Sequence, residues 1–147
     1  MAHIHQQIRD YVATQVNAIG TLTGKVYKMR NHAIDDGKLP AAVVYTNTQQ
    51  SSVITIGMMT ARGSLELVVE IYVKGASATI SDTLDELCVL AENALAADFT
   101  VNGLAKSCVL TGTEIDINVE GERAIASARL VYAVEYVTSI GDVETAQ

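Results

Sequence analysis

The stretch SLELVVEIYVKG, residues 64–75, carries an apolar side chain at every second position. This period of two is typical of a β-strand, whose successive side chains point to opposite faces of a sheet. Glu66 and Glu70 mark one face. The other face is apolar throughout and consists of Leu65, Leu67, Val69, Ile71 and Val73. The sequence therefore predicts a strand with one buried and one solvated face.

A second strand of this kind lies near the C-terminus, in SARLVYAVEYVT at 127–138. Arg129 and Glu135 fall on one side of it. The opposite side consists of Ala128, Leu130, Tyr132, Val134 and Tyr136. Three small residues precede this apolar run, namely Ala124, Ala126 and Ala128, so a helix can approach the strand closely there. The pattern extends the final strand to residues 124–138.

Three further segments have the composition of strands: 24–30, 41–46 and 107–118. In the last one, Val109 and Leu110 are adjacent, whereas Ile115 and Ile117 alternate with polar residues. This change of phase at residues 111–113 predicts a β-bulge, because one extra residue exchanges the two faces of a strand.

Helical spacing of apolar residues appears twice. The first stripe runs through residues 3–19 and consists of Ile4, Ile8, Tyr11, Val12, Val16 and Ile19. The second lies within 76–99 and consists of Leu84, Leu87, Ala91, Ala94 and Leu95, flanked by Leu90. Gly20 is expected to end the first helix, and Ser81 to cap the second. Both stripes indicate amphipathic helices that pack on a sheet.

These elements predict a single α+β domain over residues 1–147, with a mostly antiparallel or mixed sheet of about five strands and two helices on one face. Residues 47–63 are polar at both ends, and we interpret them as an extended arm, either a loop or a hairpin. The tail at 139–147 is expected to be flexible.

The charge balance argues against nucleic-acid binding. The chain has 10 basic and 17 acidic residues, a net charge of −7, and such a surface repels phosphate. The N-terminus has no apolar signal core, and no apolar run approaches the ~20 residues of a membrane span. We therefore expect a soluble protein made in a reducing cytoplasm.

Motifs for catalysis and cofactor binding are missing. Neither GxGxxG nor GxxxxGK[ST] occurs. Cys88 and Cys108 fit free buried thiols, with a disulfide or a metal site as the alternative. His3 and His5, two residues apart, would face away from each other on a helix, and His32 is the remaining histidine. We expect no enzyme activity, no cofactor and no metal.

Neighbouring carboxylates could in principle act as an acid and a base. The candidate pairs are Asp35 with Asp36, Glu114 with Asp116, and Glu120 with Glu122. Each pair falls in a turn or on the polar side of a strand, where a solvated edge explains it. These pairs therefore do not change the expectation of a non-enzyme.

Several stretches together resemble the tail terminator proteins of long-tailed phages, the minor tail protein U class. They are KVYKMR with LPAAVVYT, LELVVEIYVKG, TLDELCVLAENALAAD, LTGTEIDINVEGE and ARLVYAVEY. The resemblance covers about residues 3–138 and lies in the order and spacing of the elements. Neck and head-completion proteins share this size and topology, so a protein of that kind is one alternative.

The resemblance implies a virion protein that forms a ring, usually of six copies, at the head-proximal end of the tail tube. Its partners would be itself, the major tail tube protein and a head-completion or neck protein, while DNA passes through the lumen without sequence-specific binding. We assign Ile56, Met58, Met59 and Arg62 of the arm to the subunit or tube interface. The acidic residues proposed for the lumen or a docking face are Asp35, Asp36, Glu120 and Glu122.

Two readings of other classes remain open from the residues alone. One is a cytoplasmic α+β domain that binds a ligand or regulates a partner, dimeric through a sheet edge. The other is an enzyme that uses Cys88 or Cys108 as its nucleophile.

Overall fold

A computed structural model describes residues 3–22, 26–28, 40–55, 60–76, 78–97, 101, 103–120, 123–139 and 142–146. Within these ranges the elements follow in the order α1 (Ile4–Asn17), the 3-10 turn η1 (Gly20–Leu22), β1 (Val26–Tyr27), β2 (Ala41–Thr55), β3 (Thr60–Ala76), α2 (Ile80–Ala96), β4 (Ser107–Glu120), β5 (Arg123–Ser139) and β6 (Asp142–Ala146). The α+β class expected from the sequence is confirmed.

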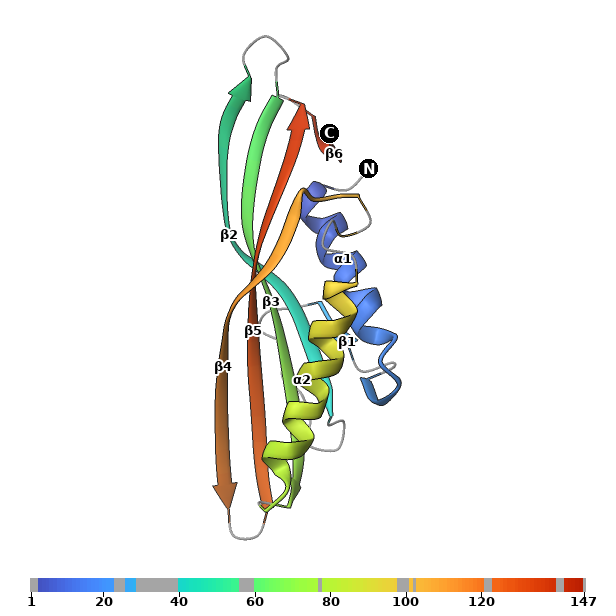
Figure 1. Ribbon diagram of the computed structural model, residues 1–147, viewed down its shortest axis with the longest axis vertical. Coiled ribbons are helices and arrows are strands. Elements are labelled where there is room, and N and C mark those ends of the chain that lie inside the picture. The colour runs from blue at the N-terminus through green and yellow to red at the C-terminus, as the bar shows by residue number, and fades with distance from the viewer. Residues whose placement is uncertain are drawn as a thin grey trace.

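The strands form one mixed sheet in the order β1-β2-β3-β5-β4. β1 pairs with β2 in parallel, and the other neighbours are antiparallel. β3 and β5 pair along their whole length, from Thr60 opposite Ser139 to Ala76 opposite Arg123. At ~3.4 Å per residue these two 17-residue strands are ~55 Å long, so the sheet is tall, narrow and visibly twisted (Figure 1).

Both helices cover the same face of the sheet (Figure 1). α1 packs on β2, α2 packs on β3 and β5, and the two helices contact each other. The first helix buries five residues of one stripe: Ile4, Ile8, Val12, Ala13 and Val16. Its predicted stop at Gly20 was close but too late, because the helix ends at Asn17 and Gly20 opens η1.

The N-cap of the second helix lies two residues earlier than expected. It is Thr79, whose side chain makes no capping hydrogen bond, and Ser81 lies inside the first turn. The predicted cap at Ser81 is therefore wrong. The cause lies in packing, because Ile80 is buried, with its Cδ1 beside the backbone of Gly75, and so belongs to the buried face of the helix. Asp82 supplies the acidic residue that the positive end of the helix dipole favours.

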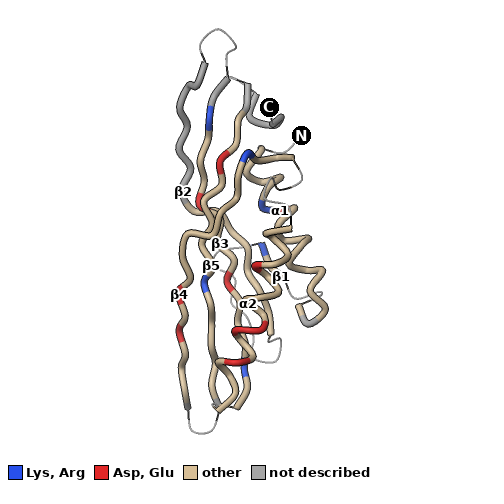
Figure 2. Tube along the Cα trace, in the orientation of Figure 1, with Lys and Arg blue, Asp and Glu red and all other residues tan. Residues whose placement is uncertain are grey.

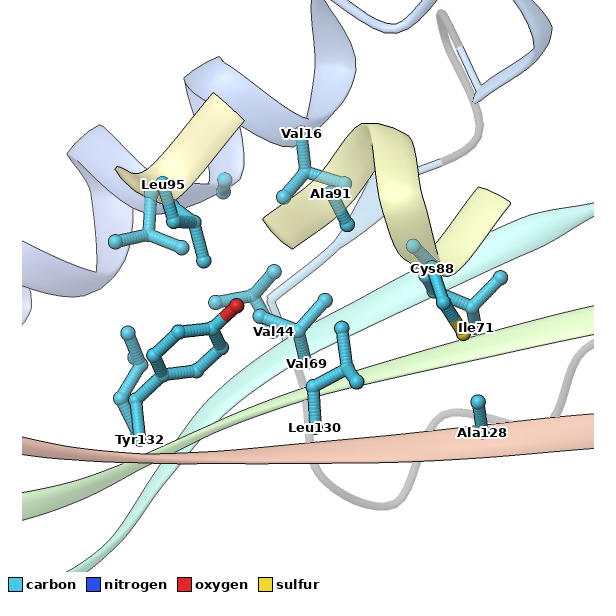
Figure 3. Packing of buried hydrophobic residues seen from close by; sticks show 14 of the residues in the cluster. Val16, Val44, Val69, Ile71, Cys88, Ala91, Leu95, Ala128, Leu130 and Tyr132 are labelled. Carbon is cyan, nitrogen blue, oxygen red and sulfur yellow. The ribbon is translucent and has the colours of Figure 1, made fainter. Parts of the chain in front are cut away.

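The main core fills the space between the helices and the sheet (Figure 3). Figure 3 shows Val16 of α1 and Ala91 of α2 facing each other above Val69 and Leu130 of the sheet. The alternate residues predicted for the buried face of β3 and β5 all lie in this core. Full burial of one such aliphatic side chain contributes about 1.5–3 kcal/mol. This layer therefore supplies most of the stability of the fold.

The outer face of the sheet holds a smaller apolar cluster of Val43, Tyr45 and Val68, against which Tyr27, Tyr72 and Val131 pack. No helix covers it in the described part of the chain (Figure 1). Among the described residues, two tyrosine rings and a valine pack against this cluster instead.

The strands differ from expectation at three places. β2 runs on to Thr55 and β3 starts at Thr60, so residues 47–55 and 60–63 continue the sheet as a hairpin, which was one of the two readings of the arm. No strand was expected after residue 138, yet β6 pairs with the end of β5. The predicted bulge is confirmed, because the register of β4 against β5 shifts between Leu110 and Gly112.

Both cysteines are free and belong to the core. Cys88 lies on α2 above Ala128 of β5 (Figure 3), and Cys108 lies on β4 opposite Val134. Burial raises the pKa of the Cys88 thiol to about 11, and the nearby carboxylates of Glu92 and Asp85 act in the same direction. Burial alone raises the pKa of Cys108 to about 11. Neither thiol is prepared for nucleophilic chemistry near neutral pH.

Gly63 on β3 is required by the side chain opposite it. A methyl group at this position would overlap the ring of Tyr136, its partner on β5. We predict that Gly63→Ala lowers the free energy of unfolding by about 1–3 kcal/mol, as overpacking of a tight core site does. Urea unfolding followed by circular dichroism measures this loss.

Gly112→Ala is the matched control, because a Cβ there meets nothing within 4 Å. Its effect should stay within about 0.5 kcal/mol of zero. Equal stability of the two variants would show that the ring of Tyr136 moves aside at no cost.

The raised thiol pKa values predict slow alkylation of the folded chain. At pH 8 a thiol of pKa about 11 is ~0.1% thiolate, and burial further hinders access of the reagent. Iodoacetamide should label both cysteines at least ~100-fold more slowly in the folded chain than in guanidinium chloride, as followed by intact mass. Rapid, stoichiometric labelling of either thiol in the folded chain would reopen the reading of a cysteine nucleophile.

Candidate functional surface

The arm residues assigned to an interface surround the turn between β2 and β3. Arg62 lies on β3, is exposed, and is paired opposite Ser52 of β2 and Val137 of β5. Ile56, Met58 and Met59 lie outside the described residues. The structure therefore places one of these four residues, at the end of a long hairpin that is hydrogen-bonded on both sides of β3.

The acidic residues assigned to a lumen or docking face are not brought together by the described structure. Glu120 is the last residue of β4 and lies opposite Arg123 of β5. The side chain of Glu120 is not described, and Asp35, Asp36 and Glu122 lie outside the described residues. Their assignment stays a prediction.

The N-terminal histidines are arranged differently from the expectation. His3 precedes the helix as its N-cap, and its Nδ1 accepts a hydrogen bond from the backbone N–H of His5 at 3.3 Å. The two ring centroids are 3.8 Å apart, so the rings do not face away from each other. The expectation failed because His3 has extended rather than helical backbone angles. Burial lowers the pKa of His5, and His3 and Arg9 lower it further.

The described residues contain no group of three or more His, Cys, Asp or Glu side chains able to hold a metal ion. No helix in the described ranges combines the length and apolarity needed to cross a lipid bilayer. His32 lies outside the described residues.

A cluster of charges crosses the outer face of the sheet around Arg129 of β5. Its guanidinium lies 3.9 Å from a carboxylate oxygen of Glu66 and of Glu70 on β3, and 3.6 Å from one of Glu114 on β4. Three carboxylates around one guanidinium leave the cluster negative. Because each of these pairs is partly exposed, each contributes ~0–1 kcal/mol.

Two tyrosines complete this cluster. The hydroxyl of Tyr45 on β2 donates to Oε1 of Glu70 at 2.7 Å, and that of Tyr72 donates to Oε2 at 2.5 Å. Burial, followed by the hydrogen bond to Glu70, raises the pKa of Tyr45 to about 12 and also raises that of Tyr72. Both hydroxyls thus stay protonated and keep donating. The arrangement connects four adjacent strands and is a structural device rather than a set of reacting groups.

The surface depressions of the described residues are open to solvent, and each includes charged side chains in its lining. One of about 690 Å³ beside α2 is lined by Asp82, Asp85, Glu86, Val89 and Leu90. Another of about 330 Å³ beside the Arg129 cluster is lined by Glu70, Tyr72, Glu114, Asp116 and Arg129 among others. Ligand sites are usually concave and mostly apolar with a few convergent polar groups. This depression fits that description poorly.

The most unusual surface is the free edge of the sheet along β4, which sequence reasoning missed. The sequence shows Ile115 and Ile117 alternating with polar residues, and in the structure they are 53% and 40% exposed, while Val119 is 53% exposed. They share the core-side face of the sheet with Ala128, Ala126 and Ala124 of β5, but neither helix packs on β4. Alternation in sequence identifies a face of a strand but not whether a helix covers it. No signal in the sequence distinguishes the two cases.

The comparisons with known proteins identify one family. The chain matches the protein family described as phage minor tail protein U over residues 3–136. No curated protein matches it. Among solved structures it is similar to a chain of the "Virion of native gene transfer agent (GTA) particle", with 14% sequence identity over 90% of this chain and 92% of that chain. The TM-score of that likeness, 0.35, is too low to carry an argument.

The family match includes α1, α2 and the sheet as far as Tyr136 of β5. It therefore covers both helices and all five strands of the main sheet order. The chain belongs to the phage minor tail protein U family and is a structural protein of the phage tail, located in the virion.

Proposed function

We propose that this tail protein forms a closed ring that caps the head-proximal end of the tail tube. The ring ends polymerisation of the tube and then presents its other face to a head-completion or neck protein. The observation that carries the proposal is the family match over residues 3–136. A ring of six copies of a 15.7-kDa chain has a mass of about 94 kDa.

The geometry of the sheet suits a ring, because each subunit of a closed ring uses two different patches. One edge of the sheet is β4, a 14-residue strand that carries exposed apolar side chains. The opposite edge is β1, which has two residues and lies beside α1. Two unlike edges on one subunit favour a head-to-tail contact.

Capping requires a ring with one face that matches the tube and one that does not. The two ends of this tall domain differ in structure (Figure 1). At one end the β2–β3 hairpin extends beyond the helices and carries Arg62. At the other end β3 leads into α2 and carries Lys74. We assign the hairpin end, with Ile56, Met58, Met59 and Arg62, to the tube.

The charge of the chain suits a channel for DNA. A net charge of −7 per subunit repels phosphate, so DNA would pass through the lumen without adhering. Asp35, Asp36, Glu120 and Glu122 stay the candidates for the lumen or the docking face. No cofactor is needed for this function, which depends on shape and contact.

The alternative of a ligand-binding or regulatory domain has less support. It requires an enclosed pocket, and the depression at the Arg129 cluster is open to solvent and has four charged residues in its lining, namely Glu70, Glu114, Asp116 and Arg129. An enzyme that uses a cysteine requires an activated thiol, whereas the pKa of each thiol is raised by burial. Another neck or head-completion protein would share the fold, and the position on the particle decides between the two.

The test of the proposed function uses purified tube protein of the same phage. Tubes polymerised with this chain should carry a ring at one end and stop growing there, as seen by negative-stain electron microscopy. Arg62→Glu should remove rings from the tube ends, because a carboxylate replaces the cation at the proposed contact.

Lys74→Glu is the matched control, because it makes the same change of charge on the same face of β3, at the opposite end of the strand. It should leave capping intact. Tubes that reach the same length with and without the chain, and bear no ring at either end, would contradict the proposed function.

A further inference from the structure

The free edge of the sheet carries an apolar surface that the monomer leaves open. We define the β4 stripe as the side chains of Thr113, Ile115, Ile117 and Val119. The pairing of β4 with β5 places them on the core-side face of β4. All four are exposed, while their β5 partners Leu130, Ala128, Ala126 and Ala124 are buried. α2 covers the β5 residues but does not pack on β4, as Figure 1 also shows.

The bulge in β4 puts these side chains on this face. Before the bulge, Cys108 and Leu110 lie on the core side, opposite Val134 and Tyr132. The extra residue Thr111, whose hydroxyl donates to the carbonyl oxygen of Val131 at 3.1 Å, then exchanges the two faces. Without it, Glu114 and Asp116 would face the core side and the apolar residues the outer side. The chain thus turns these apolar residues towards the part of the core-side face that α1 and α2 leave exposed.

We infer that the β4 stripe packs against a second copy of this chain, on the edge formed by α1 and β1. This contact rests on the proposed ring and supplies its subunit interface. The stripe spans ~20 Å along β4 and lies at the rim of the sheet, where a neighbouring subunit can take the place of a missing helix.

Charge complementarity argues for this occupant. The stripe is flanked by acidic side chains, namely Glu114 and Asp116 on β4 and Asp82, Asp85, Glu86 and Glu92 on α2. At the opposite edge, Arg9 and Lys28 share one carboxylate, that of Asp10, at 3.7 and 3.3 Å. These three described side chains of that edge therefore leave one positive charge in excess. Figure 2 shows acidic residues along β4 and α2 and basic residues on α1 and beside β1, with further basic residues on β3 and β5.

The same charges disfavour a symmetric dimer through two β4 edges. Antiparallel pairing of β4 with its own copy would bring the acidic side chains of both strands together, and like charges opposite each other destabilise a sheet. The bulge further interrupts the edge as a template for another strand. The contact is therefore heterologous, and repetition of a heterologous contact gives a ring when the rotation between subunits closes.

Ile117→Asp tests the stripe, because it places a charge in the centre of the proposed contact. It should raise the concentration at which the chain assembles by at least ~100-fold, measured by sedimentation velocity and native mass spectrometry. Ile125→Asp is the matched control. Ile125 is 37% exposed, close to the 40% of Ile117, but lies on the outer face, one register step away.

The Ile125→Asp variant should assemble within ~3-fold of the unaltered chain. The inference would be overturned if Ile117→Asp assembled at the same concentration as the unaltered chain. It would also be overturned if both variants lost assembly equally, or if the unaltered chain stayed monomeric at every concentration. Where circular dichroism shows that Ile117→Asp is unfolded, Ile117→Thr replaces it, since threonine favours strands.

A mixing experiment tests the heterologous geometry. A second variant combines Arg9→Glu with Lys28→Glu, which reverses the charge of the opposite edge and should not form rings. Mixed with Ile117→Asp, it should form a dimer and nothing larger, because one chain contributes an intact stripe and the other an intact basic edge. Absence of this dimer would overturn the assignment of the partner edge.

The outcome is separable from that of the proposed function. Rings that depend on Ile117 but bind no tube end would support the stripe and contradict capping. Capping that survives Ile117→Asp would support the proposed function and contradict the inference about the β4 stripe.

Discussion

The ladder between β3 and β5 is the interaction on which the rest of the structure depends. It pairs 17 residues of each strand without a register shift, whereas the ladders β2–β3 and β4–β5 both contain shifts. Because the side-chain period of a strand is two, an unbroken register keeps every alternate residue of both strands on the same face. α2 then packs on the continuous apolar surface of these two strands. A slip of one residue would turn that surface to solvent.

The features predicted well from the sequence are helices and strands that are buried on one face only, because such elements have a periodic pattern of apolar residues. The alternation at 64–75 and 127–138 corresponds to residues in the main core, and so does most of the two helical stripes. In the second stripe Ala94 is half-buried and the flanking Leu90 is exposed. The bulge was also visible, since an adjacent apolar pair followed by an alternating run is compatible with one sheet face only if a residue is inserted.

The missed features share one cause in the sequence, which is the lack of an apolar period. The second half of β2 reads NTQQSSVIT, and polar residues in a strand leave no period for a sequence pattern to reveal. β6 was missed for the same reason, since DVETA has no apolar alternation. Backbone hydrogen bonds to β3 and β5 define these strands, and such bonds depend on the neighbouring strand rather than on the local side chains.

The candidate surface was predictable in part. The resemblance to tail terminator proteins directed attention to the arm, and Arg62 is exposed near its end. The β4 stripe could not be found in this way, because Ile115 in the sequence looks the same as a core residue such as Leu67. Only the position of α2 over β3 and β5, set by packing between distant segments, separates an uncovered apolar face from a buried one. Local sequence does not contain that information.

The net charge explains why the association surface should be apolar. Subunits that each carry −7 repel one another, and exposed ion pairs contribute too little to offset this repulsion. Apolar contact is independent of the sign of the charge, and the stripe contains no ionisable side chain among Thr113, Ile115, Ile117 and Val119. The acidic side chains beside the stripe then determine which edge of a second copy can bind. They repel another acidic β4 edge and attract the basic edge formed by α1 and β1. An acidic subunit can in this way repel DNA and still bind its own copies.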